Sequence, residues 1–105
     1  ATAAVLHALR DRLTREEAAQ AAAQLPRELK ALWRAGEVPG RRPLRMHRRE
    51  FMERVKLAGG LPSLRKAETA VDAVFAALKD QISEGELEDI AAQLPGDLKT
   101  VWGRA

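Results

Sequence analysis

Residues 4–33 read AVLHALRDRLTREEAAQAAAQLPRELKALW, and residues 73–102 read AVFAALKDQISEGELEDIAAQLPGDLKTVW. The two stretches align without a gap at a constant offset of 69 positions, and 14 of the 30 aligned residues are identical. Similarity at a fixed offset is typical of a duplicated structural unit. The alignment therefore predicts two copies of one unit within the 105 residues.

Each copy is predicted to contain three helices. In the second copy, apolar residues recur at helical spacing and predict the first helix: Val71, Val74, Phe75, Leu78 and Ile82. The third helix follows a proline at equivalent places, Pro26 and Pro95, where the ring interrupts one helix and suits the start of the next. It carries Trp33 in one copy and Trp102 in the other, and we expect these residues to close the ends of the core.

Capping boxes predict where the second helix of each copy begins. Thr14 and Glu17 form a T-x-x-E pattern, and Ser83 and Glu86 form the matching S-x-x-E. In a capping box the hydroxyl accepts a hydrogen bond from the amide of the third helical residue, and the glutamate accepts one from the cap amide.

A turn-rich segment, Gly36–Pro43, separates the two copies and precedes a further helix with Phe51, Met52, Val55 and Ala58 inward. No run of residues alternates as a strand requires. We therefore predict an all-α fold: one compact bundle of about seven helices from two tandem pseudo-symmetric repeats. The expected single domain, 1–105, divides into repeat one (1–35), a basic linker (36–46) and repeat two with its preceding helix (47–105).

Composition and charge exclude several classes of chemistry. The chain has no cysteine, so disulfides, thiolate zinc sites and cysteine nucleophiles are excluded. Its apolar runs are too short to span a bilayer and it shows no signal peptide, which predicts a cytoplasmic protein. The net charge of +3 divides into +2 over 1–35, +4 over 36–62 and −3 over 63–105. This asymmetry favours an anionic partner at the basic middle.

The middle segment contains the candidate anion-binding residues: Arg41, Arg42, Arg45, His47, Arg48 and Arg49. Arginine is unfavourable in the first turn of a helix, where free amides and the dipole are already positive. Arg48 and Arg49 at such a place predict a site for phosphate or carboxylate, built from oriented amides and guanidinium groups. The alternative is a solvated segment whose arginines pair with acidic residues of the same chain.

No set of residues predicts catalysis. The main acidic cluster surrounds one expected helix start, where capping explains it: Asp80, Glu84, Glu86, Glu88 and Asp89. The two histidines, His7 and His47, offer too few ligands for a metal site. We therefore expect no enzyme, no catalytic residue, no metal and no cofactor.

Three motifs occur together: A-A-Q-L-P-x-x-L-K-x-x-W, the capping box before it, and R-R-P…R-R-E-F-M-E-R-V between the copies. Their combination resembles the bacterial family known as domain of unknown function 2267, over essentially the whole chain. The resemblance implies an all-helical duplicated bundle and brings no established activity, cofactor or catalytic residue. Family members usually have a counterpart of the Phe51–Ala58 helix before the first repeat, whereas this sequence starts directly in the following helix.

That difference predicts an uncovered apolar groove on the first repeat, with these candidate interface residues: Val5, Leu6, Leu9 and Leu13. Ala18 and Ala22 join them, because an alanine-rich helix face permits close approach of a helix from the same bundle or from another chain. We expect a homodimer in which each N-terminal helix covers the groove of the other subunit. The competing account is a longer monomer whose upstream helix fills the groove.

Two functions follow from these interpretations. The first is a non-enzymatic helical interaction module, of unknown pathway, that self-associates or docks a protein partner. The alternative is binding of nucleic acid or a phosphorylated ligand through Arg41–Arg49. Nucleic acid is less favoured, because two Trp, two Phe and no Tyr leave few side chains for base stacking.

Overall fold

The computed structural model describes all residues, 1–105, and contains seven α-helices and no strand. The helices are α1 (Thr2–Arg12), α2 (Arg15–Ala23), α3 (Arg27–Arg34), α4 (Arg48–Ala58), α5 (Leu64–Gln81), α6 (Glu84–Ala92) and α7 (Gly96–Arg104). The predicted all-α fold of about seven helices is confirmed. No helix combines the length and the apolar character that crossing a bilayer requires.

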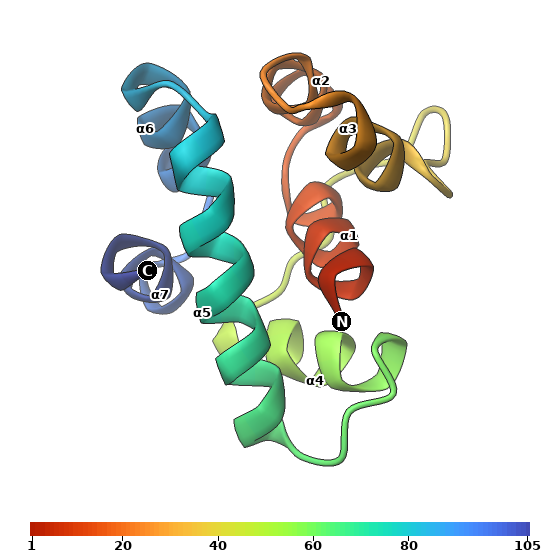
Figure 1. Cartoon of the computed structure of the whole chain (residues 1–105), viewed down its shortest axis with the longest axis vertical. Helices are drawn as coiled ribbons and strands as arrows, with labels where there is room; N and C mark the ends of the chain where they lie inside the picture. Colours follow the sequence, from red (N-terminus) through yellow and green to blue (C-terminus); the bar gives the residue numbers. More distant parts are fainter.

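The helices are arranged around α1 and α5, which pack against each other (Figure 1). α4 packs against both of them at one end of the molecule, and α2 and α6 lie side by side at the other end. α3 packs on α1 and α2, whereas α7 packs on α5 and α6, so these two short helices flank the molecule on opposite sides.

One cluster of 25 buried apolar residues fills the space between the helices. Three aromatic rings contact one another within it. The ring centroids of Phe51 and Phe75 are 5.9 Å apart, and the rings of Phe75 and Trp102 pack edge to face with their centroids 4.9 Å apart. Edge-to-face pairs contribute about 0.5–1.5 kcal/mol beyond the burial of their area. The contacts between these three rings connect α4, α5 and α7.

Both tryptophans close the core as predicted, because both are buried and both indole N–H groups have acceptors. Trp33 Nε1 donates to the carbonyl of Ala18 at 3.1 Å, and Trp102 Nε1 donates to the carbonyl of Leu87 at 3.3 Å. These hydrogen bonds connect α3 to α2 and α7 to α6.

The linker positions α4. Gly36 and Gly40 turn the chain with positive φ angles of 75° and 76°, a conformation that glycine adopts without strain. Farther along, the amide of Leu44 donates to the carbonyl of Asp11 at 2.8 Å, and Met46 is buried in the core. The linker therefore passes along the end of α1 before α4 begins.

The capping boxes are half confirmed. The hydroxyls of Thr14 and Ser83 accept from the amides of Glu17 at 3.2 Å and Glu86 at 3.3 Å, so both helices begin where predicted. The expected return bonds from the two glutamates to the cap amides are wrong, because glutamine side chains from the opposite helix accept those bonds.

The cap amide of α2 donates to Gln93 at the end of α6, at 2.9 Å, and the cap amide of α6 donates to Gln24 at the end of α2, at 2.7 Å. Each helix therefore starts beside the end of the other, and the two run antiparallel. The exchange leaves both capping-box glutamates free for other contacts.

Replacing Ser83 with alanine should lower the free energy of unfolding by about 1 kcal/mol, the usual cost of a lost N-cap acceptor. Urea denaturation followed by circular dichroism measures it. Ser83→Thr is the control, since threonine caps the equivalent helix at position 14 and should leave the midpoint nearly unchanged. Equal midpoints for the wild type and Ser83→Ala would show that the hydroxyl contributes nothing.

Candidate functional site

Arg41, the first residue of the predicted anion site, holds the linker against the end of α1. Its guanidinium donates to the carbonyls of Leu13 at 2.8 Å and Arg10 at 2.7 Å. It also pairs with Glu37 and lies 3.8 Å from Asp11. A cation at the C-terminus of a helix stabilises the carbonyls that lack helical partners. These contacts commit Arg41 to the fold.

A carboxylate of the chain itself occupies the start of α4, where the sequence predicts an anion. The amide of Arg48 donates to Asp97 Oδ2 at 3.0 Å, and His47 Nδ1 lies 3.7 Å from Asp97 Oδ1. The hydrogen bond from Arg48 is the largest of the causes that lower the pKa of Asp97, so this carboxylate stays ionised. An external anion at this helix end would have to displace Asp97.

The neighbouring arginines pair along the surface or face solvent. Arg48 binds Glu68 at 2.8 Å in a half-buried pair, and Arg49 binds Glu53 at 3.0 Å in an exposed pair that contributes little stability. Arg45 is exposed and forms no ion pair. The predicted segment therefore does not converge on one site.

A cleft of about 640 Å³ between α1, the linker and α4 gathers four arginines: Arg10, Arg41, Arg42 and Arg54. Asp11 is the one carboxylate that lines it, and it binds Arg54 at 2.9 Å. Arg10 and Arg54 are not adjacent to another basic residue in the sequence, so no local signal marks them for this cleft.

The predicted uncovered groove on α1 is wrong: every residue assigned to it is fully buried, namely Val5, Leu6, Leu9 and Leu13. α3, α4 and α5 all pack against α1. The physical reason is the path of the linker, which brings α4 across α1 as well as α5. The single helix α4 therefore covers apolar residues of both α1 and α5.

The alanine-rich face of α2 serves internal packing, the alternative that the sequence left open. Ala18 and Ala22 are buried, and with Trp33 they line a groove of about 580 Å³ between α2 and α3. Charged residues of both signs border this groove: Arg15, Glu16, Arg34 and Glu37.

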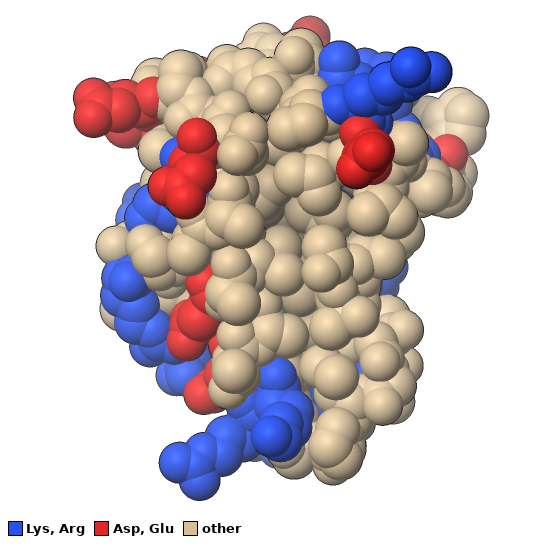
Figure 2. All heavy atoms as spheres, viewed as in Figure 1, with Lys and Arg blue, Asp and Glu red and all other residues tan.

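A depression of about 220 Å³ lies between α1, α3 and α5; Thr2, Ala73 and Ala77 are exposed in it, whereas Leu6 and Leu78 are buried. No lining residue is charged: Thr2, Leu6, Leu29, Ala73, Val74, Ala77 and Leu78. In Figure 2, uncharged atoms cover the middle of the face over α1 and α5, and the charged side chains gather toward its edges.

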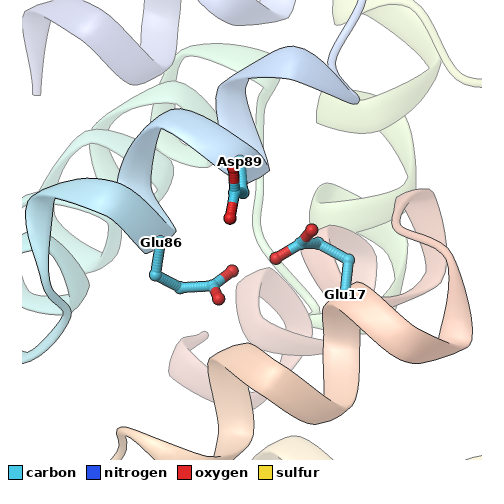
Figure 3. A group of neighbouring side chains, drawn as sticks. All are labelled: Glu17, Glu86 and Asp89. Atoms are coloured by element: carbon cyan, nitrogen blue, oxygen red, sulfur yellow. The ribbon is translucent and has the colours of Figure 1, made fainter.

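Three carboxylates meet where α2 packs against α6 (Figure 3). Glu17 projects from α2, Glu86 and Asp89 project from α6, and the carboxyl groups point toward one another. One oxygen from each residue lies within 4.8 Å of the other two. Glu17 and Glu86 are only 8% and 5% exposed, whereas Asp89 faces solvent.

The pKa of Glu86 is raised to about 8, mainly by burial and additionally by the hydrogen bond to Glu17, the charge of Glu17 and the charge of Asp89. Glu86 therefore holds a proton at neutral pH and shares it with Glu17. From the sequence, Glu86 and Asp89 are explained as acidic residues that stabilise the start of a helix. The missed signal is the alignment of residues 4–33 with residues 73–102, in which Glu17 and Glu86 are matched at the offset of 69.

The fold defines a small all-α protein whose basic segment is largely paired within the chain. Residues 1–101 match the model of the family described as "Uncharacterized conserved protein (DUF2267)", and the chain belongs to this family. The resemblance inferred from the motifs is thereby confirmed. No curated protein matches the sequence.

Proposed function

We propose that the chain is a non-enzymatic helical interaction module that associates with a second copy of itself through the face over α1, α3 and α5. The depression in this face carries the proposal. None of its seven lining residues is charged, although charged residues make up 31% of the chain. An open apolar patch with a charged rim is typical of an interaction surface.

A second copy suits this face because a two-fold dimer places the same patch on both subunits. An uncharged patch opposes itself without repulsion between like charges. Ala73 and Ala77 are exposed one turn apart on α5, so their small side chains allow the backbone of a partner helix to approach closely.

We further propose that α1–α3 and α5–α7 are two pseudo-symmetric halves. The reciprocal glutamine caps and the two tryptophan hydrogen bonds support this, since each contact recurs 69 positions later. The pair Arg10 and Lys79 adds to it: each donates to the backbone carbonyl of the following tryptophan, at 2.8 and 2.9 Å.

Light scattering over a concentration series tests the association. The wild type should form dimers at the upper concentrations, and Ala77→Glu should weaken them at least about tenfold, because a buried unpaired carboxylate is strongly unfavourable. Ala23→Glu, at an exposed position of α2 outside the depression, is the matched control and should dimerise normally. A wild type that stays monomeric at hundreds of micromolar contradicts self-association. Equal weakening by both variants would move the interface away from this face.

Binding of an anionic ligand in the cleft between α1, the linker and α4 is the second candidate function, favoured by Arg42, which lines the cleft and forms no ion pair. Inorganic phosphate or an oligonucleotide should then bind with an affinity that falls steeply with salt. Arg42→Ala should weaken binding, whereas Arg45→Ala, an exposed arginine outside the cleft, should not. Identical affinities for the two variants would exclude the cleft.

A further inference from the structure

We propose that Glu17, Glu86 and Asp89 form a binding site for a divalent cation of the size of Ca²⁺ between α2 and α6. All three would bind through carboxylate oxygens, the hard ligands that Ca²⁺ prefers. Figure 3 shows the three carboxyl groups converging on the space between the two helices. The site is separate from the face assigned to self-association and does not depend on it.

The spacing of the oxygens fits one ion. One oxygen from each residue lies within 4.8 Å of the other two. Two oxygens bound to the same Ca²⁺ at about 2.3–2.6 Å can be separated by at most about 4.6–5.2 Å. For Mg²⁺, with bonds of about 2.0–2.1 Å, the limit is about 4.2 Å. The bound of 4.8 Å on the separations lies within the range that Ca²⁺ can span, and Ca²⁺ also tolerates irregular coordination better than Mg²⁺, which requires near-octahedral geometry.

Buried oxygen atoms without partners are the second observation that points to a ligand. Glu17 and Glu86 are more than nine-tenths buried, yet Oε2 of each lacks a hydrogen-bond partner. None of the ion pairs of the chain includes Glu17, Glu86 or Asp89. At a pH where both glutamates are ionised, these buried carboxylates require a counter-charge, and no basic side chain supplies it. A divalent cation would supply it.

The arrangement also provides a route for the ion. Asp89 faces solvent, while Glu17 and Glu86 lie beneath it, so an ion can enter past Asp89. Ca²⁺ takes about 6–8 oxygen ligands, and water on the exposed side completes the shell. An ion held this way would connect α2 to α6, beside the reciprocal glutamine caps.

Calorimetric titration with Ca²⁺ on the full chain tests the site, at about pH 9 so that Glu86, whose pKa is about 8, is ionised. We expect one saturable site with a Kd of about 10⁻⁴ to 10⁻³ M, as for sites with few protein ligands, and weaker binding of Mg²⁺. Glu86→Gln and Asp89→Asn should each weaken binding at least about tenfold. Glu88→Gln removes the same charge from an exposed position of α6 and should bind as the wild type does.

Thermal unfolding with and without Ca²⁺ provides a second readout in case a variant folds poorly. The ion should raise the Tm of the wild type and of Glu88→Gln, and leave that of Glu86→Gln unchanged, since an ion stabilises only the state that binds it. Absence of saturable Ca²⁺ binding by the wild type overturns the proposal. Wild-type affinity in both Glu86→Gln and Asp89→Asn overturns it as well.

Discussion

Replacing Arg10 with methionine is expected to lower the free energy of unfolding by about 3–5 kcal/mol, the range for breaking a buried ion pair. The Arg10 side chain is 5% exposed. It donates to the carbonyls of Trp33 at 2.8 Å and Ala35 at 2.7 Å, and to Asp11 at 2.9 Å. Methionine fills much of the same volume and donates nothing, so these acceptors lose their partner inside the protein. Urea denaturation measures the difference.

Arg10→Lys is the matched control, because Lys79 occupies the equivalent place in the second half of the chain. Lys79 Nζ donates to the carbonyls of Trp102 at 2.9 Å and Ala105 at 3.0 Å. Lysine at position 10 should therefore recover the carbonyl contacts and part of the lost stability. A loss below about 1 kcal/mol for Arg10→Met would mean that water replaces the guanidinium at these carbonyls.

Raising the pH from about 5 to about 8 should destabilise the protein through Glu86. The pKa of Glu86 rises from 4.5 to about 8 on folding, mainly because of burial. Below pH 4.5 both states bind the proton, and the stabilisation is fully present. Between the two pKa values only the unfolded state ionises, so unfolding becomes easier by up to about 1.4 kcal/mol per pH unit. Above about pH 8 the folded state ionises too and the decline ends.

The groups that face Glu86 are Glu17 from α2 and Asp89 from its own helix, both acidic. The pKa of Asp97 is lowered, so its contribution to the free energy of unfolding is lost only in stronger acid, below the range from pH 5 to pH 8. Chemical denaturation in the presence of a chelator, repeated across the pH range, measures how the free energy of unfolding changes with pH.

In Glu86→Gln, the free energy of unfolding should fall less steeply with rising pH. The variant should be more stable than the wild type near pH 8, because the amide keeps the shape of the protonated acid without titrating. Glu88→Gln should retain the slope of the wild type, since that side chain is exposed. Parallel profiles for the wild type and Glu86→Gln would show that the two glutamates do not share a proton in the folded protein.

The helices and their starting points could be predicted from the sequence. Thr14 and Ser83 begin α2 and α6 as their patterns indicate, and Trp33 and Trp102 close the core. These features depend on residues within a few positions of one another, because helical periodicity, N-caps and proline act locally. The family membership likewise follows from motifs that are contiguous in the chain.

The sites could not be predicted in the same way. Val5 and Leu9 are buried because the linker carries α4 across α1, and no local pattern encodes the path of a linker. The anion expected at the start of α4 turned out to be Asp97, which lies 49 residues from Arg48. The basic segment could be recognised as charged, but the partners of its arginines depend on which helices pack together.

The sequence by itself determined the seven helices, the apolar residues that drive their packing and the family of the protein. Only the tertiary structure decided which groups meet. Because α2 and α6 pack antiparallel, the cap amides donate to the side chains of Gln24 and Gln93. The same packing brings Glu17 against Glu86, 69 residues apart in the sequence. The physical reason is the range of the forces: a helix start is fixed by neighbours along the chain, whereas a shared proton or an ion site requires oxygens a few ångströms apart in space.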